Sequence, residues 1–73
     1  MPEESNQLKK LVNIATDLEL PADLRIKAIK QLGDIGSHET LLALLELAGN
    51  DRLIRKERDL ALKQAREIIK SGR

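Results

Sequence analysis

The sequence predicts an all-α protein, and three observations support this fold class. Apolar residues recur at helical spacing in four segments, which gives each segment one apolar face. Only short stretches separate the segments, and short connections place neighbouring helices antiparallel. Part of the pattern also recurs 33 residues further along the chain. We therefore expect four antiparallel helices, paired as two stacked hairpins in a single domain spanning residues 1–73.

The first two helices are predicted in the N-terminal half of the chain. The apolar face of the first consists of Leu8, Leu11, Val12, Ile14, Ala15 and Leu18. The second begins after Pro21, whose fixed φ suits a first helical turn, and Asp23 adds favourable negative charge there. Its apolar face consists of Leu24, Ala28, Leu32 and Ile35. Gly36 is expected to end this helix.

Capping residues mark the third and fourth helices. Ser37 is the predicted N-cap of the third, with Glu39 in its first turn, and Gly49 is the predicted C-cap. The apolar positions of the third helix are Leu41, Leu44, Leu45, Leu47 and Ala48. Asn50 or Asp51 is expected to cap the fourth helix, which extends to about Lys70. Its apolar positions are Ile54, Ala61, Ala65 and Ile68.

The composition limits what this domain is built from and what it can hold. Apolar residues make up 41% of the chain and none is aromatic, so the core consists of Leu, Ile, Val and Ala, with Leu32 and Leu44 expected inside it. There is no cysteine and one histidine, His38, which excludes disulfides and histidine-cluster metal sites. We expect no cofactor. The longest apolar run, residues 41–45, is far shorter than a membrane span, and the N-terminus lacks a signal peptide, so we expect a cytoplasmic protein without membrane contact.

An internal repeat accounts for all four helices. One set of residues, Leu8, Leu11, Val12, Ile14 and Ala15, aligns with Leu41, Leu44, Leu45, Leu47 and Ala48. A second set, Arg25, Ala28, Lys30, Gln31 and Ile35, aligns with Arg58, Ala61, Lys63, Gln64 and Ile68 at the same offset of 33. The shared Arg, Lys and Gln are polar identities that Leu-rich helices would not match by chance. We place repeat 1 at about 6–36 and repeat 2 at about 38–70.

The stretch from Leu24 to Glu39 resembles the short HEAT-like repeat of the phycobilisome-lyase type. The residues that match its pattern are Arg25, Ala28, Leu32, Gly33, Ile35 and Gly36. The second copy keeps Arg58, Ala61 and Ile68 but has Ala65, Arg66 and Ile69 at the other positions. The resemblance implies two HEAT-like helical hairpins stacked as a short, right-handed α-α superhelix. It also implies that the two arginines reach acidic or carbonyl groups in the turns, where the available acids are Asp17, Glu19 and Asp51.

The outer flanks of the helices predict where the stack ends. Ile26, Ile29 and Gly33 form a second flank on their helix, which can dock against the next repeat. The equivalent residues of the last helix are Asp59, Leu62 and Arg66, two of which are charged. The first helix similarly has Lys9 and Lys10 where the third has Leu42 and Ala43. These charges predict a self-capped pair of repeats. We expect Leu62 and Ile69 to remain partly exposed, which would favour self-association. The expected oligomeric state is therefore a monomer or a weak homodimer.

The sequence favours a non-enzymatic protein–protein interaction module. His38 and the carboxylate pairs Glu3/Glu4 and Asp17/Glu19 have no nucleophile or pocket nearby in the pattern, so no catalytic residue is expected. The expected binding surface lies on the second helix of each repeat. It consists of Lys27, Lys30, Gln31 and Asp34 beside Leu60, Lys63, Gln64 and Glu67. Leu60 is the expected exposed apolar anchor. A regulatory or chaperone subunit of a lyase-type enzyme is an alternative that shares this surface.

The distribution of charge supports a further alternative, nucleic-acid binding. Residues 1–50 carry five basic and eight acidic groups, whereas residues 51–73 carry eight basic and four acidic groups. Six basic residues fall in one sector of the predicted fourth helix: Arg52, Arg55, Lys56, Lys63, Arg66 and Lys70. Such a stripe can meet phosphates, and in surface use it resembles DNA-binding HEAT-like glycosylases. A solvated outer face is the alternative reading of the stripe, and the lack of aromatic residues disfavours single-strand recognition.

Overall fold

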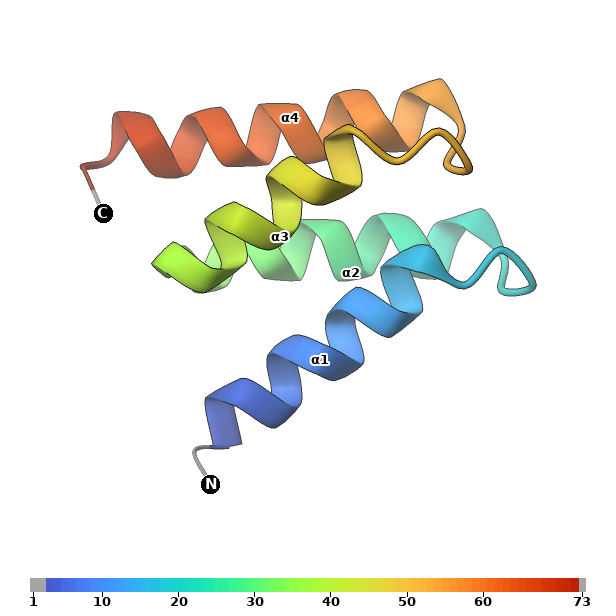
Figure 1. The fold of residues 1–73 in the computed structure, drawn as a ribbon, viewed down its shortest axis with the longest axis horizontal. Helices are drawn as coiled ribbons and strands as arrows, with labels where there is room; N and C mark the ends of the chain where they lie inside the picture. Colours follow the sequence, from blue (N-terminus) through green and yellow to red (C-terminus); the bar gives the residue numbers. More distant parts are fainter. Residues whose placement is uncertain (1–2, 73) are drawn as a thin grey trace.

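The computed structural model describes residues 3–72, which form four α-helices and no strand. They are α1 (Glu3–Thr16), α2 (Ala22–Ile35), α3 (His38–Ala48) and α4 (Arg55–Lys70). Each of the two hairpins, α1–α2 and α3–α4, is antiparallel, and α2 and α4 run in the same direction (Figure 1). The predicted all-α fold is confirmed.

Helix α2 lies at the centre of the molecule. It packs against α1, α3 and α4, whereas α1 and α4 do not contact each other. The first and last helices are therefore the two ends of the arrangement (Figure 1). This is the order expected when one helical hairpin is stacked on the next.

Most helix ends form where the capping residues predict them. Gly36 ends α2 with φ of 64°, a left-handed conformation that residues with a Cβ rarely adopt, and its N–H donates to Leu32 O. Ser37 then caps α3, because its Oγ accepts a hydrogen bond from Thr40 N at 3.1 Å. Gly49 ends α3. The two-residue link of Gly36 and Ser37 holds α2 and α3 close together.

The start of α4 differs from the prediction. The helix begins at Arg55, and neither Asn50 nor Asp51 caps it. Asn50 Oδ1 instead accepts a hydrogen bond from Arg52 N at 2.9 Å and so stabilises the turn before the helix. This turn places the side chain of Leu53 in the core, where it is buried. The gain from burying Leu53 explains why the turn is not absorbed into α4.

The core is aliphatic and draws on all four helices. Its buried members are Leu11, Ala15, Ala28, Ile29, Leu32, Leu44, Leu47, Leu53, Ala61, Ala65 and Ile68. Leu32 and Leu44 are fully buried, as predicted. Alanines at Ala15, Ala61 and Ala65 have no exposed surface, and their small size lets the helix backbones approach closely.

The joint between α2 and α4 uses the predicted flank of α2. Ile29 is fully buried, and Gly33 lies directly against Gln64 of α4. A Cβ on Gly33 would overlap the Gln64 amide, so glycine lets Gln64 pack in this position against α2. The flank therefore holds one hairpin against the other. Across residues 3–72, no helix is both long and apolar enough to cross a membrane.

Candidate functional site

The structure divides the predicted binding surface of α2 and α4 into three parts. Six of its residues are exposed: Lys27, Lys30, Gln31, Asp34, Lys63 and Glu67. The other two, Leu60 and Gln64, are half-buried because they face α2. The residues of each part line a different hollow of the surface, and the three parts also differ in charge.

The first part is a groove between α2 and α4. Its lining residues are Ile26, Lys30, Lys56, Asp59, Leu60 and Lys63. Ile26 and Leu60 provide apolar surface from opposite helices, and Lys30, Lys56 and Lys63 surround it with positive charge. The groove has a volume of about 380 Å³. This is near the lower end for small-molecule pockets, about 300–1,000 Å³, and suits one or two side chains of a partner.

The second part continues along the same two helices toward their C-terminal ends. There the lining residues are Gly33, Asp34, Gly36, Glu67, Ile68 and Ser71. Asp34 and Glu67 make this end acidic, in contrast to the lysine-rich groove. The surface between α2 and α4 thus changes from positive to negative along its length, which would orient a charged segment lying on it.

The third part lies on the opposite side of α2. Lys27 and Gln31 border a hollow between α1 and α2, together with Leu11, Ile14, Leu20, Leu24 and Ala28. The predicted surface therefore does not form one continuous patch. Lys27 and Gln31 share a helix with the α2–α4 groove but do not line it.

Leu60 is not the exposed anchor that the sequence predicted. It is half-buried and packs against the core cluster, while part of its side chain lines the groove. The wheel of α4 alone could not reveal this, because the neighbouring α2 covers that side of the helix. Leu60 contributes to the floor of the groove, and the exposed lysines form its rim.

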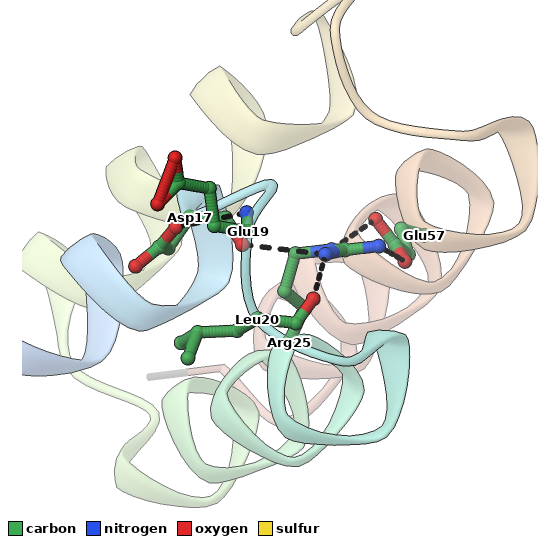
Figure 2. A network of polar contacts seen from close by, with 5 residues as sticks. All are labelled: Asp17, Glu19, Leu20, Arg25 and Glu57. Carbon is green, nitrogen blue, oxygen red and sulfur yellow. Dashed lines mark hydrogen bonds and ion pairs between the residues drawn. The ribbon is translucent and has the colours of Figure 1, made fainter.

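A buried ion pair fixes α2 against α4 beside this surface. Arg25 Nε and Nη2 donate to Glu57 Oε1 and Oε2 at 3.0 and 2.9 Å. Arg25 Nη1 donates to Leu20 O at 2.6 Å and to Asp17 O at 3.2 Å in the α1–α2 turn (Figure 2). Both side chains are buried. One guanidinium thus connects the turn of the first hairpin to the start of α4.

The prediction for Arg25 is partly right and partly wrong. Its guanidinium does reach the turn carbonyls, but its acidic partner is Glu57 and not the side chain of Asp17, Glu19 or Asp51. The hydrogen bonds that Arg25 donates to Glu57 raise the pKa of Arg25 above its ordinary value, against the effect of desolvation. The arginine is therefore charged at any physiological pH and acts as a structural tie.

Arg58, which is equivalent to Arg25 by the repeat, has no such partner. Within residues 3–72 its Nε is buried and makes no hydrogen bond. The expectation of a shared role for the two arginines is thus not met. The reason is positional, since Arg25 meets its acid on the facing helix α4, whereas no helix of residues 3–72 faces the corresponding side of α4.

Glu57 is the structural residue that the sequence analysis missed. It lies on the same side of α4 as Gln64 and Ile68, toward the core. A carboxylate on the inner face of a helix, with an arginine available on the facing helix, is the signal that could have identified it. The local pattern drew attention instead to acids in the turns.

The basic face of α4 is largely as predicted. Arg55, Lys56, Lys63, Arg66 and Lys70 lie on α4 and are exposed. Arg55 forms a long, exposed ion pair with Asp59 at 3.8 Å. Arg52 precedes the helix, in the turn stabilised by Asn50, so its position on a helical wheel was wrong.

The described residues show no assembled metal centre. No group of three or more His, Asp or Glu side chains is placed to hold a metal ion in this part of the chain. His38 is the exposed first residue of α3, and its neighbour Glu39 supplies charge to the helix N-terminus. The arrangement can present charge and apolar surface to a partner.

Comparison with known proteins adds no relative. No family model, no curated protein and no solved structure matches the chain.

Proposed function

We propose that the chain is a non-enzymatic, HEAT-like module that binds a protein partner through the groove between α2 and α4. The 33-residue repeat and the stacking of the two hairpins through α2 support the HEAT-like assignment. Stacked repeats of this kind create extended surfaces that bind partners. The proposal needs no chemistry from the protein beyond recognition.

The observation that carries the proposal is the make-up of the groove. Apolar surface from Ile26 and Leu60 lies within a rim of Lys30, Lys56 and Lys63, which outnumber the one acid of the groove, Asp59. An apolar side chain can be desolvated on the floor while flanking carboxylates meet the lysines. The expected partner is therefore an acidic segment that carries one or two large apolar side chains.

Selection of random peptides on the immobilised full chain tests this function without knowledge of the natural partner. We expect enrichment of a large apolar residue flanked by Asp or Glu. Lys30→Glu should weaken a selected peptide by about tenfold or more, because it reverses a rim charge. Lys70→Glu is the matched control, since Lys70 is exposed on α4 but does not line the groove. Selection of basic peptides, or an equal loss of peptide affinity in the Lys30→Glu and Lys70→Glu variants, would contradict the proposal.

Nucleic-acid binding through the basic face of α4 is the second candidate. Five exposed cations on one helix favour it. Against it stand Asp59 on the same face, a net charge of only +1 and the absence of aromatic residues. A regulatory subunit of a lyase-type enzyme would use the same groove as the first proposal.

Two charge reversals separate the protein and nucleic-acid candidates. Lys30 lines the groove but lies on α2, whereas Arg66 lies on the basic face of α4 and not in the groove. If duplex DNA is the ligand, Arg66→Glu should weaken a gel shift and Lys30→Glu should have much less effect. Binding should then also fall steeply with salt, because neutralised phosphates release counterions.

A further inference from the structure

The internal repeat allows equivalent surfaces of the two hairpins to be compared. A surface that is covered in one repeat and exposed in the other lacks a neighbour. The N-terminal end face consists of Leu11, Ile14, Leu20, Leu24, Lys27, Ala28 and Gln31, which line the hollow between α1 and α2. The residues 33 positions later are Leu44, Leu47, Leu53, Glu57, Leu60, Ala61 and Gln64. In repeat 2 this second set is mostly buried, and it includes the Glu57 and Gln64 contacts to α2. In repeat 1, Leu11 and Ala28 are also buried, but Ile14, Leu24, Lys27 and Gln31 are exposed.

The exposures of matched residues show the size of this difference. Leu47 is 2% exposed, but its equivalent Ile14 is 36% exposed. Glu57 is 0% exposed, but its equivalent Leu24 is 41% exposed. The end face of repeat 1 is thus apolar, like the equivalent surface that is covered in repeat 2. No helix of residues 3–72 covers it.

The other end of the molecule shows the reciprocal difference. The C-terminal end face consists of Leu45, Asp59, Leu62, Arg66 and Ile69. The residues 33 positions earlier are Val12, Ile26, Ile29, Gly33 and Gly36. Ile29 is 0% exposed in its joint with repeat 2, whereas Leu62 is 37% exposed. Leu45 and Ile69 are exposed as well. The predicted capping by Asp59 and Arg66 therefore leaves apolar surface uncovered.

We propose that a second copy of this chain covers these surfaces, with the C-terminal end face of one copy seated on the N-terminal end face of the next. The joint between the two repeats is the template, because it unites the same two surfaces within one chain. Charge at the faces fits this order at one point, since the C-terminal end face carries Asp59 and the N-terminal end face carries Lys27. The proposal rests on the end faces and does not depend on the α2–α4 groove.

Individual contacts follow from the template. Ile26 and Leu60 line one groove inside the chain, so the joint between copies brings their equivalents, Asp59 and Lys27, together with opposite charges. The contact of Gly33 with Gln64 becomes Arg66 against Gln31. Gln31 is exposed and free to move aside, and its amide oxygen can accept a hydrogen bond from the guanidinium.

One contact of the template is missing between copies. Arg58 takes the place of Arg25, but Leu24 stands where Glu57 would supply the carboxylate. The buried, unpartnered Nε of Arg58 is consistent with an interface that lacks this acid. The joint between copies should therefore be weaker than the joint within the chain, and association should depend on concentration.

Sedimentation of the full chain with face-specific variants tests the proposal. Wild-type protein should exceed the mass of a dimer as concentration rises, because a head-to-tail interface does not close on itself. Ile14→Glu blocks the N-terminal end face and Leu62→Glu blocks the C-terminal end face, so each variant alone should be monomeric. Mixed together, the two variants should form a 1:1 dimer through their intact faces.

The control for apolar exposure is Ile54→Ser. Ile54 is 52% exposed in the α3–α4 turn, outside both end faces, and serine suits its N-cap position. This variant should associate as wild type does. A wild-type chain that is monomeric at about 1 mM would overturn the proposal. So would a closed dimer that Leu62→Glu leaves intact, or variants that remain folded by circular dichroism but do not pair when mixed.

A gain of affinity tests the register of the joint. Leu24→Glu supplies the missing carboxylate in the first turn of α2, where negative charge suits the helix N-terminus. It should tighten association by about tenfold through Arg58, and Arg58→Met should remove that gain. Weaker association of Leu24→Glu, regardless of residue 58, would contradict the α2-like register.

Discussion

At the scale of residues, the Arg25–Glu57 pair is the contact on which the joint between hairpins most depends. Arg25 donates hydrogen bonds to four acceptor atoms, two of which lie in the α1–α2 turn. Glu57 has no exposed surface. Removal of one partner leaves the other buried without compensation, which is far more costly than loss of an exposed ion pair.

Glu57→Ala should therefore lower the Tm much more than Asp59→Ala, although both remove a carboxylate of α4 that pairs with an arginine. Thermal unfolding followed by circular dichroism provides the measurement. The double variant R25M/E57L should recover much of the loss, because apolar residues of similar size can replace a buried pair. Equal Tm values for the two alanine variants would show that the buried pair does not hold the hairpins together.

Arg25 also shows how far the sequence can specify this region. Its contact with turn carbonyls was expected from the resemblance to HEAT-like repeats. Its bond to Glu57 was not, because this contact spans 32 positions and depends on how α2 and α4 are aligned. Wheel geometry orders residues around one helix but does not say which neighbour meets each side.

At the scale of elements, most helix ends were predictable from caps, but the helix faces only in part, since Leu18, Leu24 and Ile54 of the predicted faces are exposed. Ser37, Gly36 and Gly49 act locally, so a local pattern reveals them. The start of α4 was wrong because tertiary packing decided it, through the burial of Leu53. The same limit explains Leu60, whose exposure is set by α2 and not by its own helix.

The core positions make a direct prediction for the elements. Leu32→Ala and Leu44→Ala should each lower the free energy of unfolding by about 2–5 kcal/mol, through lost burial and a residual cavity. Leu42→Ala, at a half-exposed position of α3, should cost much less and is the matched control. Urea denaturation gives all three values. A cost below about 1 kcal/mol at both core sites would mean that the helix faces are misassigned.

The contact at Gly33 predicts a difference between equivalent positions of the two repeats. Gly33→Leu should destabilise the fold by about 1–3 kcal/mol, because a side chain there overlaps Gln64, so that either the Gln64 side chain or the packing of α2 on α4 must change. Arg66→Leu, at the equivalent position of exposed α4, should change the stability of the monomer little. The comparison is made by urea denaturation at low protein concentration. Similar costs would show that α2 does not approach α4 as closely as described.

At the scale of the whole molecule, equivalent surfaces of the two repeats occur in three places. They are buried in the joint between α2 and repeat 2, and they are exposed at the N-terminal and C-terminal end faces. The fold class and the repeat were predictable, since both are periodic in sequence. The division of the α2–α4 surface into a lysine-rich groove, an acidic end and the hollow beside α1 was not, because it arises from helix packing.

The central claim is that the groove between α2 and α4 is the binding site, and amide chemical-shift mapping tests it most directly. An acidic peptide from the selection is titrated into ¹⁵N-labelled full-length protein. We predict that the largest shifts cluster at Ile26, Lys30, Leu60 and Lys63, on the two helices that form the groove. Shifts centred on Arg66 and Lys70, or on Ile14 and Leu24 of the N-terminal end face, would contradict the claim.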